Sequence, residues 1–218
     1  TIAAGGDMPC HYPTAVWLHD RLLPQLRLHG WYPGAYLGHP LLLYYFPFPF
    51  LLMSVLAGAF GMPVGFKLGT ALGAFLLPLL CYASFRLMRA VFPAPLLAAA
   101  AALVFLYVEE TPIWGGTIAS TLAGEFSYTY GVAFAVLFLG VLVRSRADGR
   151  GPWLPAAALA LTAYAHGYAV LWAGLGAAGL LLADPAPRRA PDASKLATSA
   201  LASSSVRLAG WLAAVALL

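Results

Sequence analysis

The sequence has 218 residues, of which 61% are hydrophobic and only 9% are charged. Roughly a quarter of the residues in a soluble globular domain carry a charge, so this composition excludes that class and indicates a membrane protein. The 12 Lys and Arg residues exceed the 8 Asp and Glu residues, which gives a net charge of +4. Because these cations lie in short loops between apolar runs, we expect the lipid bilayer, and no nucleic acid, as a partner.

Residues 1–63 are predicted to form an extracytoplasmic loop with amphipathic or interfacial helices. Within it, residues 41–60 contain Pro47, Pro49 and a dense group of Tyr and Phe side chains. Proline interrupts helical hydrogen bonding, and aromatic residues concentrate at membrane interfaces. We therefore favour a shallow helix on the outer leaflet. The alternative is a Pro-kinked full span, which would move Asp7 to the other compartment.

Three charge-free stretches of about 18 residues follow, the length that one helix needs to cross a hydrocarbon core of about 30 Å. They predict transmembrane helices over about residues 67–86, 93–109 and 126–143. Nine of the 12 cations lie on one side of these helices, which the positive-inside rule makes cytoplasmic. These nine are Arg86, Arg89, Arg144, Arg146, Arg150, Arg188, Arg189, Lys195 and Arg207.

The uncharged stretch between Arg150 and Asp184 is too long for one upright helix and too short for two full crossings. His166 and Gly167 lie at its middle, so we predict a re-entrant hairpin of two short helices over residues 153–183. Irregular backbone at this depth must be covered by protein or water, so the turn should line a cavity. Residues 64–183 are thus predicted as the transmembrane core of an all-α, polytopic helix bundle.

The C-terminal part is predicted to hold a flexible cytoplasmic loop over residues 184–207, because this segment is rich in Pro, Ala and Ser. Residues 208–218 are apolar and should begin a further transmembrane helix. The run is shorter than the about 20 residues of a crossing, and the sequence starts at Thr1 without an initiator methionine. We therefore expect the sequence to be a fragment of a longer protein.

Two carboxylates are the candidate catalytic residues. Asp7 follows two glycines in GGDMPCHYP, which would let the backbone approach a ligand, and His11 follows one helical turn later. A helix cap or turn is an equally good interpretation of Asp7. Glu125 has apolar neighbours on both sides, and an acid at membrane depth tends to mark a functional cavity. Its alternative role is a cap on the helix that begins at residue 126.

Other residues are candidates for substrate binding. Of the adjacent acids Glu109 and Glu110, we expect one to mark only the water boundary, and we keep Glu110 as a candidate. Lys67 and Arg21 are placed to bind a lipid phosphate, although such cations also snorkel to headgroups without a specific role. His166 would bond a ligand from the hairpin tip or pack as a lone core histidine. Tyr36 would stack on a sugar or belong to an interfacial aromatic belt.

The segment GGDMPCHYPTAVWLHDRLLPQLRLHGWYPGAYLGHPLLLYYFPFPF resembles the first large extracytoplasmic loop of bacterial membrane glycosyltransferases of the GT-C superfamily. The sequence is most similar to the branch of 6-pyruvoyl-tetrahydropterin-synthase-related membrane proteins. Two further segments, GGTIASTLAGEFSYTYG and AYAHGYAVLWA, also resemble that branch.

The resemblance implies that Asp7 is the general base of an inverting sugar transfer from a polyprenyl-phosphate donor to a glycan, lipid or protein acceptor. Many relatives have a second acid in this loop, whereas here Met8 follows. Glu125 or His11 would then have to take its place. If a divalent cation such as Mg²⁺ or Mn²⁺ takes part, its ligands would be Asp7, His11 and Glu125.

The expected localisation is the inner (plasma) membrane, as a multi-pass protein with an extracytoplasmic active face. The rival hypothesis is a non-catalytic protein of the same architecture, which binds or transports a lipid carrier or serves in an envelope-polysaccharide complex. The sequence has no cluster of histidines of the kind that binds zinc, so it does not support soluble pterin chemistry. Cys10 and Cys81 likewise offer neither zinc-ligand spacing nor a disulfide framework.

Overall fold

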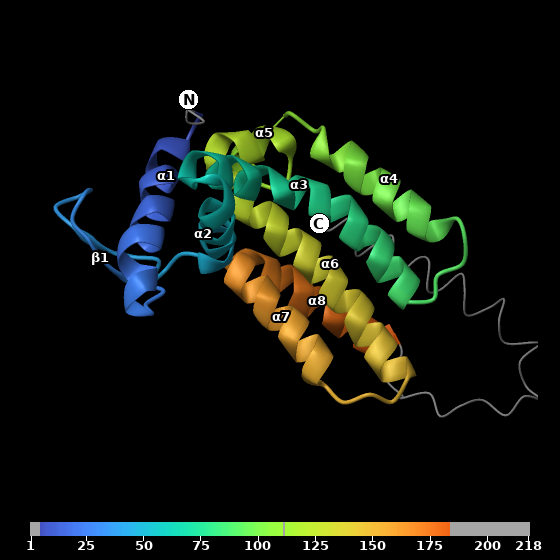
Figure 1. The fold of residues 1–218 in the computed structure, drawn as a ribbon. Helices are drawn as coiled ribbons and strands as arrows, with labels where there is room; N and C mark the ends of the chain where they lie inside the picture. Colours follow the sequence, from blue (N-terminus) through green and yellow to red (C-terminus); the bar gives the residue numbers. More distant parts are fainter. Residues whose placement is uncertain (1–4, 111, 184–218) are drawn as a thin grey trace, which may run out of the picture.

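The computed structural model describes residues 5–110 and 112–183, and this part of the chain is mostly helical (Figure 1). Its first elements are α1 (Met8–Trp17), η1 (Leu18–Leu22), η2 (Leu23–Gln25), β1 (Gly30–Tyr32), β2 (His39–Leu41), α2 (Pro47–Phe60) and α3 (Met62–Leu87). Then follow α4 (Ala94–Leu106), η3 (Pro112–Trp114), α5 (Ile118–Ser120), η4 (Thr121–Glu125), α6 (Phe126–Ala147), α7 (Trp153–Ala165) and α8 (Gly167–Ala183).

Helix α6 is the centre of the bundle. It packs against α3 on one side and against α7 and α8 on the other, while α4 lies along the far side of α3 (Figure 1). Tyr130 of α6 is fully buried and donates a hydrogen bond of 2.5 Å from its hydroxyl to the carbonyl oxygen of Gly69 in α3. Further along, Ser84 Oγ of α3 donates to the carbonyl oxygen of Val136, at 2.6 Å. Polar side chains thus join the two long helices at two levels.

In the part of the chain that the structure describes, two segments are long and apolar enough to cross a membrane. They are Met62–Leu87, with 26 residues, and Ile118–Ala147, with 30 residues. They contain the predicted helices at residues 67–86 and 126–143. At a rise of about 1.5 Å per residue, each exceeds the about 30 Å of a hydrocarbon core.

Helix α4 is shorter than the span predicted over residues 93–109. It has 13 residues, so it is about 20 Å long, and it ends at Leu106. Pro95 lies in the first turn of α4, where a missing N–H loses no helical hydrogen bond. If the helix started earlier, Pro95 would lie in its interior and disrupt it. The apolar composition of the stretch therefore indicated a longer helix than the backbone forms.

Helix α2 has 14 residues and begins at Pro47. Pro47 and Pro49 lie in its first turn, where they start the helix and do not break it. The helix is about 21 Å long, too short to form a full span over residues 41–60. It packs on α3. Its depth in the outer leaflet stays a prediction.

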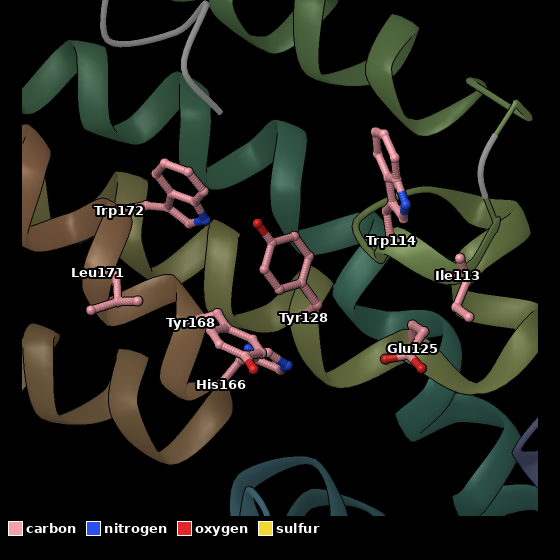
Figure 2. A pocket seen from close by; sticks show the side chains of 8 residues that line it. All are labelled: Ile113, Trp114, Glu125, Tyr128, His166, Tyr168, Leu171 and Trp172. Carbon is pink, nitrogen blue, oxygen red and sulfur yellow. The ribbon is translucent and has the colours of Figure 1, made fainter.

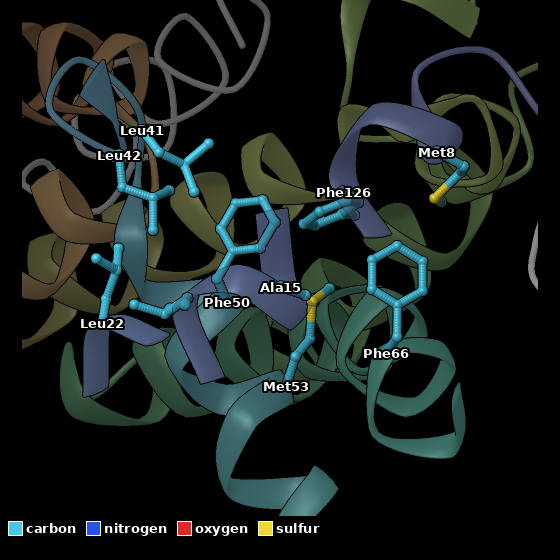
Figure 3. Close-up of a cluster of buried hydrophobic side chains, with 10 residues drawn as sticks. Met8, Ala15, Leu22, Leu41, Leu42, Phe50, Met53, Phe66 and Phe126 are labelled. Carbon is cyan, nitrogen blue, oxygen red and sulfur yellow. The ribbon is translucent and has the colours of Figure 1, made fainter. Parts of the chain in front are cut away.

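The N-terminal region contains one departure from the all-helical prediction. Strands β1 and β2 form a small antiparallel ribbon in which Trp31 pairs with Pro40. The region also shares a core with the bundle, and Figure 3 shows its apolar side chains meeting. This core joins Met8, Ala15, Leu18, Leu22, Leu41, Leu42, Phe50, Met53, Phe66 and Phe126. Helices α1 and α2 therefore share a core with α3 and α6, and the extracytoplasmic position of this region stays a prediction.

Helices α7 and α8 form the predicted pair of short helices, with the break at His166. Its backbone is extended, with φ −166° and ψ 126°, between the two helices. Both helices pack on α6 (Figure 1). A re-entrant position in the bilayer stays a prediction. The predicted loop at residues 184–207 and the helix start at residues 208–218 lie outside the described residues.

Three arginines surround one carboxylate at the end of the bundle away from α1. Asp148, just after α6, binds Arg144 at 2.7 Å, Arg89 at 3.1 Å and Arg150 at 3.6 Å. Arg89 follows α3, so the cluster ties the ends of the two long helices together. Sequence inspection counted these cations for topology but did not find their shared partner.

Candidate functional site

The segment before α1 lies against the irregular turn before α6. The backbone N–H of Asp7 donates to the carbonyl oxygen of Ala123 at 2.7 Å. Gly124 has φ +118°, and a Cβ there would lie 2.9 Å from the Cβ of Asp7. Gly6 has φ +47°, and its Cβ would lie 2.1 Å from the Ala123 carbonyl oxygen. The glycines before Asp7 therefore allow the backbone there to pack closely against residues 121–125 of the same chain.

Both candidate carboxylates occupy N-cap positions without acting as side-chain caps. Asp7 precedes α1 and Glu125 precedes α6, and neither side chain makes a cap hydrogen bond with the described residues. The helix dipole still favours an anion at each position. Asp7 is exposed and Glu125 is partly exposed, so both carboxylates can reach a ligand.

An imidazole and a phenol lie beside the two carboxylates. The His11 ring contacts Tyr45, Phe50 and Phe126, with ring centroids 5.1 to 5.8 Å apart. Burial lowers the pKa of His11, and the carboxylate of Asp7 acts against this shift. Burial also raises the pKa of Tyr45, opposed by the Ser127 hydroxyl and supported by the charges of Glu125 and Asp7. Both charges act on Tyr45, in line with the close approach of Asp7 to Gly124, the residue before Glu125.

A pocket of about 300 Å³ opens beside Glu125. Figure 2 shows Glu125 on one side of Tyr128 and His166 with Tyr168 on the other. The complete lining is Ile113, Trp114, Glu125, Tyr128, His166, Tyr168, Leu171 and Trp172. The hairpin tip and the turn before α6 thus meet at one cavity, whereas we expected Asp7 to share a hollow with Glu125 beside the hairpin. Asp7 does not line it.

His166 is held firmly at the pocket wall. Its ring centroid lies 4.2 Å from that of Phe46, 5.0 Å from that of Tyr128 and 5.6 Å from that of Tyr168. Only 7% of the residue is exposed. A Cβ added at Gly131 of α6 would lie 2.6 Å from the Cβ of His166, so this glycine allows the hairpin tip to approach α6.

The remaining predicted substrate-binding residues lie elsewhere. Arg21 is exposed on η1, with its guanidinium 6.0 Å from the centre of the Trp17 ring. Tyr36 is 88% exposed in the turn between β1 and β2. Lys67 is exposed near the start of α3, and Glu110 is exposed after α4. None of these four lines the pocket.

The predicted metal ligands Asp7, His11 and Glu125 are near one another but are not arranged as a metal site. In residues 5–110 and 112–183, no group of three His, Cys, Asp or Glu side chains could hold a metal ion. The His11 ring is packed among the aromatic side chains of Tyr45, Phe50 and Phe126.

Sequence reasoning missed the aromatic side chains that form most of this site. Tyr45, Tyr128, Tyr168 and Trp172 were not singled out, because aromatic residues are common throughout this sequence. A usable signal was their position. Tyr128 follows Glu125 by three residues and Tyr168 follows His166 by two, so each lies near a polar residue that was chosen.

The fold and the site define a helical membrane protein with a partly polar, aromatic pocket beside two carboxylates. The chain belongs to the family described as the 6-pyruvoyl-tetrahydropterin synthase related domain of membrane proteins, whose model matches residues 42–208. The match includes Glu125 and His166 and begins after Asp7 and His11. No curated protein and no solved structure matches the chain.

Proposed function

We propose that the chain carries the catalytic site of an integral membrane glycosyltransferase at the extracytoplasmic face of the inner membrane. The enzyme transfers a sugar from a polyprenyl-phosphate donor to a glycan, lipid or protein acceptor. The observation that carries the proposal is the pairing of Asp7 with the turn at residues 121–125, next to the aromatic pocket.

Asp7 is the general base in this proposal. Its carboxylate is exposed and free of a cap bond to the described residues, so it can accept a proton from an acceptor hydroxyl. The acceptor oxygen then attacks the anomeric carbon from the face opposite the phosphate. The bond to the phosphate oxygen breaks, polyprenyl phosphate leaves, and the configuration inverts.

The pocket supports the proposal by its size and its lining. A volume of about 300 Å³ is enough for one sugar ring but not for a polyprenyl chain. Tyr and Trp side chains offer apolar faces together with polar edges, a combination that suits a sugar. The polyprenyl tail would remain in the bilayer, beside the apolar outer surfaces of the helices.

The alternative function is binding of a lipid carrier without catalysis. It is favoured by the position of Asp7, which lies near Glu125 but outside the pocket lining. A binding protein needs the pocket and does not need the base. The two functions therefore differ in whether Asp7 is required for anything beyond folding.

Replacing Asp7 with asparagine tests the proposal. In membranes supplied with labelled polyprenyl-phosphate sugars, we expect Asp7→Asn to lower transfer by about a hundredfold or more, because a general base contributes on this scale. Asp20→Asn, an exposed acid on η1, is the matched control and should retain transfer. Equal turnover by wild type and Asp7→Asn would remove Asp7 from the role of base. Ligand binding without any turnover would favour the alternative function.

A further inference from the structure

The end of the bundle away from α1, where α3 and α6 finish, is strongly basic (Figure 1). Residues 86–93 and 144–154 contain five arginines and one aspartate, which gives these two segments a net charge of +4. The helix dipoles change this charge little. Each segment joins the C-terminal end of one helix, α3 or α6, to the N-terminal end of the next, α4 or α7, so opposite partial charges lie side by side.

Asp148 gathers three of these arginines around one carboxylate. Its oxygens lie 2.7 Å from Arg144 Nε, 3.1 Å from Arg89 Nη2 and 3.6 Å from Arg150 Nε. One carboxylate balances only one of the three charges, so the cluster keeps a charge of +2. A guanidinium has five N–H donors, and each of these ion pairs uses one nitrogen. The side chains of Arg89 and Arg150 are 63% and 60% exposed, so both can also donate to a ligand.

The shared carboxylate makes this cluster different from isolated arginines at a membrane edge. An isolated arginine reaches toward the headgroups in many rotamers and loses that freedom when it binds one of them. Here the ion pairs already hold Arg89, which follows α3, and Arg150, which follows α6, at the same carboxylate. Exposed ion pairs add little to stability, so tying α3 to α6 does not by itself account for three arginines at one aspartate.

Exposed aromatic side chains follow the arginines in both segments. Phe92 comes three residues after Arg89 and is 83% exposed, and Trp153 comes three residues after Arg150 and is 82% exposed. Helices α3 and α6 lie in the two segments long enough to cross a membrane, so their ends are expected at the level of the lipid headgroups. Aromatic residues concentrate at that level. The pattern suits a ligand with an anionic head and an apolar tail.

We propose that the arginine cluster around Asp148 binds the headgroup of an anionic phospholipid. The guanidinium groups of Arg89 and Arg150 donate to the phosphate oxygens, and the acyl chains lie beside Phe92 and Trp153. This end of the bundle is the one predicted to be cytoplasmic, and the cytoplasmic leaflet is rich in anionic lipids. The inference is independent of the proposed function, because the cluster lies at the opposite end of α6 from the carboxylate pocket.

The first test compares brominated phosphatidylglycerol with brominated phosphatidylcholine on the wild-type protein in phosphatidylcholine nanodiscs. Bromine quenches nearby tryptophans, and the quenching that Trp153→Phe removes is the signal from this surface. We expect phosphatidylglycerol to be preferred by about fivefold or more at about 0.1 M salt, and the preference to shrink at about 1 M salt, where exposed charges are screened. Equal quenching of Trp153 by the two lipids at low salt would overturn the proposal.

The second test separates a site at Asp148 from general surface charge. Arg150→Gln removes one charge from the cluster and leaves its two shorter ion pairs, so we expect about a fivefold loss of preference. Arg86→Gln is the matched control, since it removes the same charge from an exposed side chain at the same end, outside the pairs with Asp148. It should change the preference by less than about twofold. Equal losses in the two variants would refute a site.

Two further measurements complete the test. Thermal melting in phosphatidylcholine nanodiscs checks the folding of each variant, and Arg89→Gln, also exposed, should reproduce the loss seen with Arg150→Gln. Inorganic phosphate is then added at constant ionic strength to the wild type with bound brominated phosphatidylglycerol. We expect it to displace the lipid no better than chloride does, because phosphate has no acyl chain. Displacement by phosphate alone would assign the cluster to a soluble anion and overturn the lipid assignment.

Discussion

Asp7 and Glu125 have the same local setting, since each lies directly before a helix and makes no side-chain cap bond to the described residues. A carboxylate at such a position usually accepts hydrogen bonds from the first helical N–H groups. Here the backbone of Asp7 is tied to Ala123 instead, and this places its side chain beside the turn that holds Glu125. Both residues therefore occupy the N-cap position, but neither side chain caps its helix through a hydrogen bond to the described residues.

The pH dependence of stability is a prediction about His11. Burial lowers its folded-state pKa below the usual 6.5. The unfolded chain then binds the proton more readily, so the stability contribution is full above pH 6.5 and is lost as the pH falls below it. We expect His11→Phe, which keeps an aromatic ring in place, to show a smaller drop in melting temperature between pH 7.5 and 5.5. An identical drop in both proteins would contradict the shift.

At the scale of elements, the hydrophobic stretches of the sequence predicted the positions of the helices better than they predicted the helix ends. The apolar stretches at residues 67–86 and 126–143 lie inside α3 and α6. By contrast, α4 and α2 are shorter than their apolar stretches, and prolines lie in their first turns. Hydrophobicity measures which residues prefer lipid, whereas a helix ends where backbone geometry changes.

The contact between α2 and α3 depends on Gly65. A Cβ at this position would lie 2.6 Å from the backbone nitrogen of Ala57 and 2.8 Å from the carbonyl oxygen of Met53. Both are backbone atoms that cannot rotate away, so Gly65→Ala should push the helices apart and destabilise the protein by about 1 to 3 kcal/mol. Gly58→Ala, in the same helix pair, is the control because nothing lies within 4 Å of its Cβ. Unfolding in detergent measures both, and equal stability would refute the close packing.

At the scale of the whole molecule, charge is distributed between two ends of the bundle. Asp7 and Glu125 lie near the start of α1 and α6, and Asp148 with its three arginines lies at the opposite end of α6. By the positive-inside rule, the end with the arginines is the one predicted to be cytoplasmic. The orientation itself stays a prediction.

The native Cys10 provides a test of the orientation, because it is exposed one turn from Asp7. In a Cys81→Ser background, we expect a membrane-impermeant maleimide to label Cys10 in intact spheroplasts. The matched control is Gly151→Cys combined with Cys10→Ser, which places the thiol in the exposed loop before α7. That thiol should be labelled only after the membrane is permeabilised. The reverse pattern would place Asp7 in the cytoplasm and rule out an extracytoplasmic site.

The sequence by itself determined that the chain is a helical membrane protein, where its long helices lie, and that its hairpin breaks at His166. These properties are local, because the preference of each residue for lipid adds along the chain. It did not determine the small β-ribbon or the aromatic pocket. These were decided by the tertiary structure, in which the positive φ angles of Gly6 and Gly124 let two distant segments meet. No local pattern specifies which backbone segments approach within hydrogen-bond distance, since that follows from how all the helices pack around α6.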